Sequence, residues 1–194
     1  MAIPSRAEAA QILQSLDPPD WHLAHSAAVA DVAAFLAAKI EGQGHAINVT
    51  LCEVAALLHD IDKALPKTDP LKVMGHADAG AQWLSDNGYG ELSAAVAAHP
   101  VTKLAEEEHY GLWSVSATVE ERVVAYADKR AMQDLCSMDE RFRHWVEKHG
   151  DTEVMHVARE RADRLEASVC AAAGISVEEV ARQRWGEAAL ASAG

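Results

Sequence analysis

The stretch from Leu51 to Lys63, LCEVAALLHDIDK, decides how this chain folds. Residues 51–58 are apolar at nearly every position, which is typical of a helix that is buried on all sides. His59 and Asp60 follow this run directly. A carboxylate beside a buried helix is costly unless it binds a metal ion or pairs with a positive charge. The stretch therefore predicts a helical core that ends at a polar site.

Three other segments place a histidine or an aspartate beside an apolar helical run. His25 precedes the run 27–30, His99 follows the run 94–98, and Asp128 follows the run 123–127. One such histidine taken alone is more often an ordinary core or surface residue than a ligand. The ordered set, however, favours convergence on one buried cation or a pair of cations. Imidazole and carboxylate ligands without thiolates suit divalent iron, manganese, cobalt, nickel or zinc.

Helix signals dominate the rest of the chain. Alanine is abundant, and alternation of β-branched residues is nearly absent. Five capping boxes, each a hydroxyl residue followed three positions later by Glu, begin apolar-periodic stretches at Ser5, Thr50, Thr118, Ser137 and Ser176. We therefore expect an all-α protein. Its helices are predicted at residues 5–16, 20–41, 50–65, 76–87, 91–99, 118–134, 137–149, 152–173 and 176–191.

Length and composition fit one globular domain with an appendage. The chain has 194 residues, of which 49% are hydrophobic and 24% are charged. We expect a domain over residues 1–150 and a C-terminal pair of helices over residues 151–194, which either packs on the core or mediates association, for example in a homodimer. The apolar stripe between 152 and 173 recurs every three or four positions, and this favours packing on its own domain over pairing with a second chain.

Charge and cysteine usage limit the partners and the compartment. Lys plus Arg is 17 and Asp plus Glu is 30, so the net charge is −13. Such a surface repels polymeric nucleic acid but allows a small phosphorylated substrate at a locally positive site. Cys52, Cys136 and Cys170 are widely spaced, which argues against a disulfide framework and favours a reducing compartment.

The sequence shows no sign of a signal peptide or a membrane-spanning helix. The first twenty residues lack a signal-peptide core, and charged residues interrupt every apolar stretch before it reaches about 18 residues. We expect a cytoplasmic protein with no membrane partner.

The order of these polar residues resembles a known family. His25, then His59-Asp60 within AALLHDIDK, then Asp128 within VVAYADKR, resembles the H…HD…D pattern of the HD-domain metal-dependent phosphohydrolase superfamily. The resemblance covers about residues 20–134 and implies an HD-type helical bundle. Asp62 stands where glycine is frequent in the family, which is a departure from the common pattern.

Two further histidines point to one branch of that superfamily. His76 in GHADAGAQWL and His99 in AVAAHP resemble the bimetallic H…HD…H…H…D subset, which includes diadenosine tetraphosphate hydrolases and cyclic-dinucleotide phosphodiesterases. The stretch HADAGAQWLSDNGY is most similar to the diadenosine tetraphosphate group. The GYP motif of one cyclic-dinucleotide group is absent.

The resemblance implies a ligand set and a reaction. One divalent ion would be held by His25, His59, Asp60 and Asp128, and a second by Asp60, His76 and His99. Iron or manganese is favoured, with cobalt, nickel or zinc as alternatives. A hydroxide bridging the two ions would attack phosphorus in a small, nucleotide-like phosphate ester or phosphoanhydride. Asp60 and Lys63 are the catalytic residues that the resemblance implies.

The charged neighbours of these ligands have candidate roles as well. Lys63 and Arg130 are expected to bind substrate phosphate oxygens, although Lys63 could instead cap a helix and Arg130 fits a surface ion pair equally well. Lys129 is expected to form a surface ion pair. Asp62 either orients a ligand histidine or lies exposed. His22 is interpreted as an ordinary neighbour or a wall of the site, and the histidines expected at the surface are His45, His144, His149 and His156.

Other interpretations stay open at this point. A one-metal nucleoside monophosphatase would use His76 and His99 only to line the pocket. A non-catalytic nucleotide-binding module would keep the metal site for stability or sensing, and a plain packing protein would hold no metal, because ligands and fold do not determine function. Residues 100–117 lack periodicity and predict a long loop, either a lid or a solvated surface loop.

Overall fold

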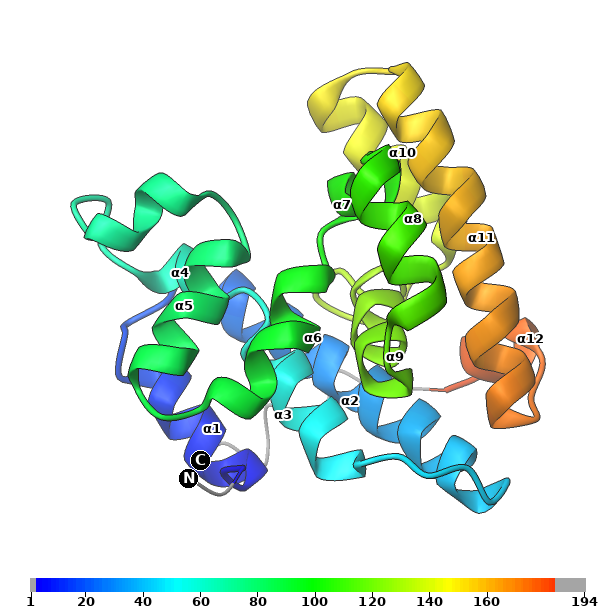
Figure 1. Cartoon of the computed structure of the whole chain (residues 1–194), viewed down its shortest axis with the longest axis horizontal. Helices are drawn as coiled ribbons and strands as arrows, with labels where there is room; N and C mark the ends of the chain where they lie inside the picture. The colour runs from blue at the N-terminus through cyan, green and yellow to red at the C-terminus, as the bar shows by residue number, and fades with distance from the viewer. Residues whose placement is uncertain (1–2, 184–194) are drawn as a thin grey trace.

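The structure, a computed structural model, describes residues 3–183, and within that range it contains helices and no β-strand (Figure 1). The all-α fold is therefore as predicted. In chain order the elements are α1 (Arg6–Gln14), α2 (Asp20–Gly42), α3 (Val49–Leu57), α4 (Ile61–Ala64), the 3-10 helix η1 (Pro70–Met74), α5 (Asp78–Asp86), the 3-10 helix η2 (Gly90–Leu92), α6 (Ser93–Ala98), α7 (Val101–Ala105), α8 (Glu107–Ser116), α9 (Val119–Asp128), α10 (Met138–His149), α11 (Glu153–Ala173) and α12 (Val177–Ala181).

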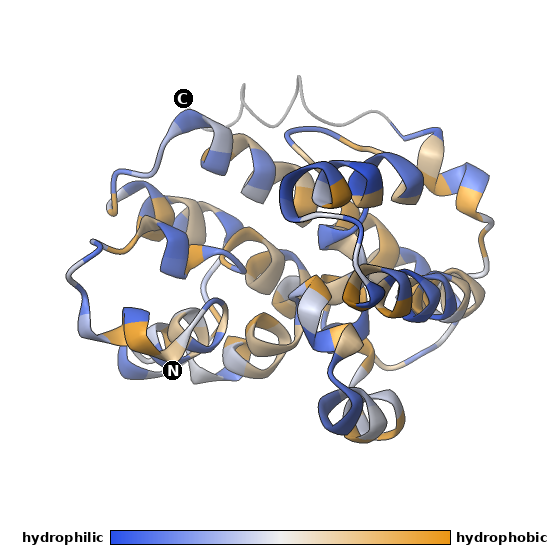
Figure 2. Cartoon of the chain, turned by 90° about the horizontal axis from the view of Figure 1, so that it is seen from above, coloured by the Kyte–Doolittle hydropathy of each residue, from blue (hydrophilic) through white to orange (hydrophobic). Residues whose placement is uncertain are grey.

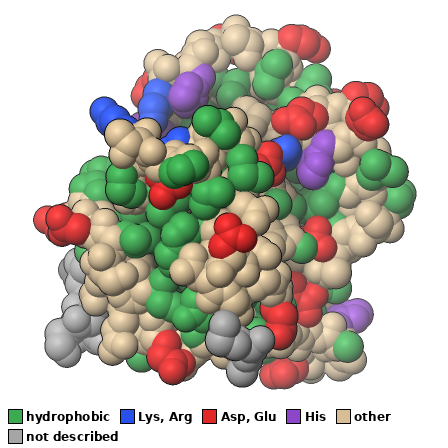
Figure 3. Space-filling view, turned by 60° about the vertical axis from the view of Figure 1, so that its left-hand side comes forward, with side chains coloured by type: hydrophobic (Ala, Val, Ile, Leu, Met, Phe, Trp, Pro, Cys, Tyr) green, Lys and Arg blue, Asp and Glu red, His purple; other side chains and the backbone are tan. Residues whose placement is uncertain are grey.

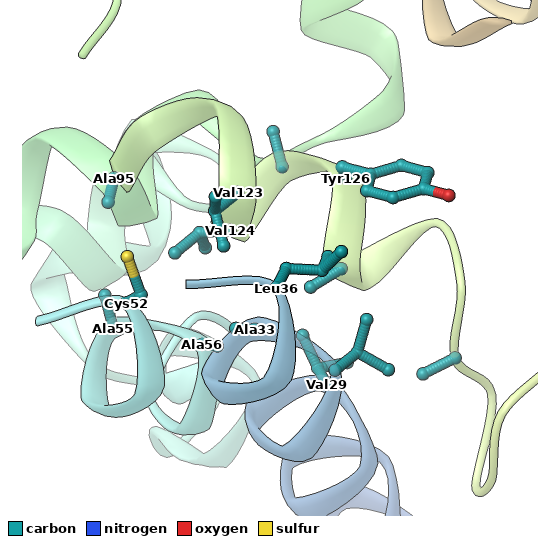
Figure 4. Close-up of a cluster of buried hydrophobic side chains, with 14 of the residues drawn as sticks. Val29, Ala33, Leu36, Cys52, Ala55, Ala56, Ala95, Val123, Val124 and Tyr126 are labelled. Atoms are coloured by element: carbon teal, nitrogen blue, oxygen red, sulfur yellow. The ribbon is translucent and has the colours of Figure 1, made fainter. Parts of the chain in front are cut away.

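Helix α2 lies at the centre of the core. It packs against α3, α9 and α11, and α3 also contacts α9 and α6. Figure 4 shows side chains of these helices gathered in one buried cluster, among them Val29, Ala33, Leu36, Cys52, Ala55, Val123 and Val124. Alanines on α2 and α3 let the two backbones approach closely, and full burial of one valine or leucine contributes about 1.5–3 kcal/mol. This packing holds the ends of several helices in one place.

Most of the predicted helix starts are correct. Capping boxes are present at Ser5, Thr118 and Ser137, where each hydroxyl accepts from the N3 backbone and the N3 glutamate reaches back. Ser176 caps α12 by accepting from the backbone of Glu179. The predicted start at Thr50 is wrong, because Asn48 caps α3 two residues earlier. The predicted last helix continued to residue 191, and its part beyond 183 lies outside the described residues.

Two predicted segments end or divide where the chain turns. The segment 50–65 is two helices, because the backbone leaves helical geometry between Leu57 and Ile61. The segment 118–134 ends as a helix at Asp128, and the chain then folds into a short bridged turn between Ala131 and Leu135. Both breaks fall at candidate ligand residues, which helix ends present to a common space.

The predicted loop 100–117 is wrong. Residues 101–116 form α7 and α8 instead. Leu104 and Trp113 are buried, so tertiary packing anchors two helices that lack a clear apolar period.

Helix α11 carries its apolar stripe against the same molecule. It packs on α7, α2 and α9, and the buried members of the stripe are Met155, Ala158, Ala162, Leu165 and Val169. In Figure 2 the outer helices are largely hydrophilic along their outward edges. The stripe is thus covered within the chain.

By length and composition, α2 could cross a membrane. It is the one such helix among the described residues, and 56% of its most apolar window is buried inside the molecule. Burial of this kind is also what a core helix of a water-soluble protein shows, so the helix is weak evidence for a membrane span.

Candidate metal centre

Six side chains from five segments of the chain meet at one position, where five of them are buried and His76 is partly exposed. His25 comes from the first half of α2, His59 and Asp60 from the turn between α3 and α4, and Asp128 from the last residue of α9. His76 precedes α5, and His99 directly follows α6. The structure therefore brings together all six residues for which the sequence predicted metal ligation.

One group of ligands surrounds Oδ2 of Asp60. This oxygen lies 3.4 Å from Nε2 of His59 and 3.6 Å from Nε2 of His25. Oδ1 of Asp128 lies 3.5 Å from Nε2 of His25 and 3.7 Å from Nε2 of His59. Four donor atoms thus face one small space.

A second group surrounds the other oxygen of the same carboxylate. Oδ1 of Asp60 lies 3.3 Å from Nε2 of His76 and 3.5 Å from Nε2 of His99. This oxygen is buried and has no hydrogen-bond partner among the described residues. Asp60 therefore stands between two donor groups and turns one oxygen toward each.

Hydrogen bonds orient every histidine of the centre. Nδ1 of His25 donates to the carbonyl of Met132 at 2.7 Å, Nδ1 of His59 to Ala56 at 2.7 Å and Nδ1 of His99 to Val96 at 2.6 Å. A carbonyl oxygen only accepts, so Nδ1 carries the proton and Nε2 presents its lone pair to the centre.

His76 is oriented by a carboxylate rather than by the backbone. Its Nδ1 donates to Asp62, 3.0 Å from Oδ2 and 3.2 Å from Oδ1. Asp62 is buried. Of the two roles expected for Asp62, the structure has the one that orients a histidine.

The facing lone pairs test whether a cation fits this site. Nε2 of His25 lies 3.1 Å from Nε2 of His59, and Nε2 of His76 lies 3.2 Å from Nε2 of His99. Two lone pairs at this distance repel each other unless a proton or a metal ion lies between them. With the unpartnered Oδ1 of Asp60, these donors fit divalent transition-metal ions in two adjoining positions.

The protonation states also suit metal binding. Burial is the largest influence on His59 and lowers its pKa well below the usual value. Burial opposes ionisation of Asp60 and Asp128. The combined effect of His59, His99 and Lys63 around Asp60, and of Arg141, His25 and Lys129 around Asp128, outweighs it, so the pKa of each carboxyl is well below its usual range. Neutral imidazole and ionised carboxylate are the forms that bind metal ions.

Lys63 lies at the edge of the centre. Its Nζ is 2.6 Å from Oδ2 of Asp60, and its side chain is 40% exposed. It also lines a cavity of about 400 Å³ that opens beside His25 and Asp60. The ammonium group is therefore placed where an anion bound in the cavity would meet it.

Lys129 and Arg130 do not line that cavity. The Lys129 side chain is fully buried, donates to the carbonyls of His99 and Ala125, and has its pKa lowered to about 8 by burial. The expected surface ion pair of Lys129 is therefore wrong. Arg130 donates to the Tyr126 hydroxyl and pairs with Glu166 at 3.0 Å. Its guanidinium is taken up by these internal contacts, so we do not retain a role in substrate binding for Arg130.

Sequence reasoning missed the cavity residues contributed by α10. Arg141 pairs with Oδ1 of Asp128 at 2.9 Å, and its guanidinium lies over the Trp145 ring. His144, expected at the surface, is exposed but lines the same cavity as Trp145 and Lys148. The helical spacing of these residues was the signal available, but nothing in the sequence indicated that α10 folds over Asp128.

His22 and Trp21 complete the wall of the site on α2. Trp21 lines the cavity and is 48% exposed, and its ring stacks on His22 with centroids 5.4 Å apart. His22 is fully buried, and neither ring nitrogen has a hydrogen-bond partner among the described residues. Burial lowers the pKa of His22. His22 therefore backs the wall rather than joining the ligands.

Comparison with protein families now adds a match to this geometry. The model of the HD domain family matches residues 23–133, which is more than half of the chain. The chain belongs to the HD domain family. The matched span contains all six residues of the centre and Lys63, whereas α10 lies beyond it. HD domains are generally metal-dependent hydrolases. No curated protein and no solved structure matches the chain.

Proposed function

We propose that this HD domain protein hydrolyses a phosphate ester or phosphoanhydride in a small, nucleotide-like substrate with the help of two divalent metal ions. The observation that carries the proposal is the Asp60 carboxylate, whose two oxygens face two separate groups of histidine nitrogens. A single-ion site would need one oxygen, whereas a bridging carboxylate is typical of paired ions. The resemblance to diadenosine tetraphosphate hydrolases is part of this proposal.

The ligands divide between two positions. His25, His59 and Asp128 would hold one ion. His76 and His99 would hold the other, and Asp60, which lies near both groups, would contribute to both. When bound, such ions polarise phosphoryl oxygens and make water more acidic near neutral pH. Iron or manganese is the identity that we favour, with cobalt, nickel or zinc as alternatives, because a donor set of imidazole and carboxylate suits all five ions.

The residues of the chain have distinct tasks in this scheme. Lys63 would neutralise a phosphate oxygen from its position beside Asp60. Asp62 keeps Nε2 of His76 turned toward the centre, and Arg141 keeps Asp128 in place. His59 is fully buried, so the ligand side of the centre excludes bulk water and strengthens these charge interactions.

Hydrolysis by the purified protein, followed by chromatographic separation of the nucleotide products, tests the proposal. The panel contains dinucleoside polyphosphates, nucleoside monophosphates and cyclic dinucleotides, each with manganese, with iron and with chelator. Products are separated because symmetrical cleavage of a dinucleoside polyphosphate and ring opening of a cyclic dinucleotide release no inorganic phosphate. We expect hydrolysis that requires metal and that falls at least about 100-fold in Asp60→Asn, which removes the charge shared by both positions.

Asp86→Asn is the matched control, because Asp86 is an exposed aspartate at the end of α5 outside the centre. It should keep the wild-type rate. Hydrolysis by Asp60→Asn at the wild-type rate would contradict the proposal. Tight nucleotide binding with no hydrolysis of any compound would instead indicate a non-catalytic module, and one ion per active chain would favour the one-metal monophosphatase.

A further inference from the structure

One face of α10 lines the cavity beside the metal centre. Arg141, His144, Trp145 and Lys148 recur at intervals of three and four residues, which places them on the same side of the helix. Trp21 and Lys63 contribute to the same cavity. The α10 residues lie outside the span matched by the family model, so this wall belongs to the individual chain rather than to the shared motif.

The charge of the cavity is opposite to that of the molecule. Acidic residues outnumber basic ones by 30 to 17 in the chain. Among the described residues that line the cavity, Asp60 is the one carboxylate, whereas Lys63, Arg141 and Lys148 are cations. In the face drawn in Figure 3, acidic side chains are spread over the surface, while Lys and Arg are gathered in its upper half. A local positive potential in an acidic protein attracts anionic ligands.

The three cationic side chains differ in whether they are free to bind a ligand. Lys63 is in contact with Asp60, and Arg141 with Asp128, so both are tied to the metal ligands. Lys148 is exposed and makes no ion pair with any residue that the structure describes, and the same holds for His144. These two side chains are therefore donors that an incoming ligand could use.

Spacing along α10 limits what that ligand is. Lys148 lies seven residues after Arg141, which is about 10 Å along the helix axis. Arg141 contacts the metal ligand Asp128, so it marks the inner end of the cavity. A compact monophosphate bound at the metal centre would leave Lys148 without a partner.

Resting on the phosphohydrolase function above, we propose that Lys148 and His144 bind a second anionic group of the substrate. The substrate class is then a phosphorylated compound that carries more than one phosphate, such as a nucleoside triphosphate. Lys148 supplies a charge-assisted hydrogen bond to the second phosphate group, and His144 adds a further donor. The outer face of Trp21, which is 48% exposed, offers a flat apolar surface to the base.

Steady-state kinetics of Lys148→Gln test this subsite. The probes are AMP and ATP, which share a base and differ in the length of the phosphate chain. We expect the KM for ATP to rise about tenfold in Lys148→Gln, with kcat within twofold of wild type and the KM for AMP unchanged. Arg143→Gln is the matched control, since Arg143 is an exposed cation of the same helix that does not line the cavity. It should alter neither KM.

Measuring binding without turnover tests the subsite independently of catalysis. The ligand is an ATP analogue in which methylene groups replace both bridging oxygens of the triphosphate. Calorimetric titration with it should show about tenfold weaker binding to Lys148→Gln than to wild type and to Arg143→Gln. Equal affinity for all three proteins, or no binding to wild type, would overturn the subsite. An equal loss in Arg143→Gln would overturn it too, because a general charge effect would then explain the change.

The two proposals fail separately. If wild type hydrolyses AMP or ATP and Lys148→Gln behaves as wild type, the subsite is wrong and the phosphohydrolase function stands. If wild type hydrolyses neither probe nor any compound of the panel, the function is wrong, while Lys148-dependent binding of the methylene analogue still supports an anion subsite. Lys148 is exposed, so the variant should unfold at the same temperature as wild type.

Discussion

At the scale of single residues, Asp60 organises the centre. Its Oδ2 lies near His25 and His59, while its Oδ1 lies near His76 and His99. A buried acceptor without a partner costs about 1–3 kcal/mol. Oδ1 is therefore held in a position that a cation would stabilise, and the surrounding hydrogen bonds to Nδ1 atoms keep the other donors aimed at the same place.

The contact between Asp62 and His76 makes a prediction about one ion position. Asp62→Asn removes the negative charge behind Nδ1 of His76, which lowers the basicity of Nε2. Titration calorimetry of the chelator-treated protein with manganese should show the weaker of two sites losing about 10- to 100-fold in affinity. Asp86→Asn should bind as wild type does. Two unchanged sites in Asp62→Asn would show that this hydrogen bond does not support the second position.

His22 makes a prediction about pH. Its pKa in the folded protein is lowered by burial, so when the pH falls below about 6.5 the unfolded chain binds a proton that the folded chain does not. The folded protein therefore loses stability on acidification, and His22→Leu removes this loss. The gain in unfolding free energy of His22→Leu over wild type should therefore be larger at pH 5.5 than at pH 8, measured by urea unfolding in chelator.

His45→Gln serves as the comparison, because His45 is exposed. Its difference from wild type should be the same at both pH values. An equally constant difference for His22→Leu would contradict the interpretation that buried His22 resists protonation.

At the scale of elements, helix starts were readable from the sequence and helix breaks were not. Ser5, Thr118 and Ser137 are local signals, because the cap and its partner lie three residues apart. The break after Leu57 has no such signal, since tertiary contacts of His59 and Asp60 decide it. The two helices in 101–116 were missed for the same reason: packing of Leu104 and Trp113 overrides a weak local pattern.

The start of α3 makes a prediction that separates the observed cap from the expected one. The Asn48 side chain accepts from the backbone of Leu51, whereas Thr50 lies inside the helix and is exposed. Asn48→Ala should cost about 1 kcal/mol of unfolding free energy, and Thr50→Ala a few tenths at most. Chemical denaturation of both variants measures the difference. A larger cost for Thr50→Ala would restore the capping box that the sequence suggested.

At the scale of the whole molecule, the cluster of candidate ligands was predictable and the cavity wall formed by α10 was not. His25, His59, Asp60 and Asp128 each border an apolar run, so their burial follows from local pattern. Arg141 reaches Asp128 only because the chain folds back after α9, and no local pattern encodes that contact. The same limit applies to Lys129, which the fold buries against the carbonyl of His99.

The central claim is that six side chains from five segments hold two metal ions, and the number of ions per chain tests it most directly. Chelator-treated protein is loaded with manganese, freed of excess metal by gel filtration, and measured by elemental analysis beside its protein concentration. We predict about two ions per chain in wild type and in Asp86→Asn, and at most one in Asp60→Asn, whose side chain serves both positions. Loading should also raise the unfolding temperature of wild type, because the ions bind the folded state. One ion or fewer per chain in loaded wild type, or two ions retained in Asp60→Asn, would contradict the account.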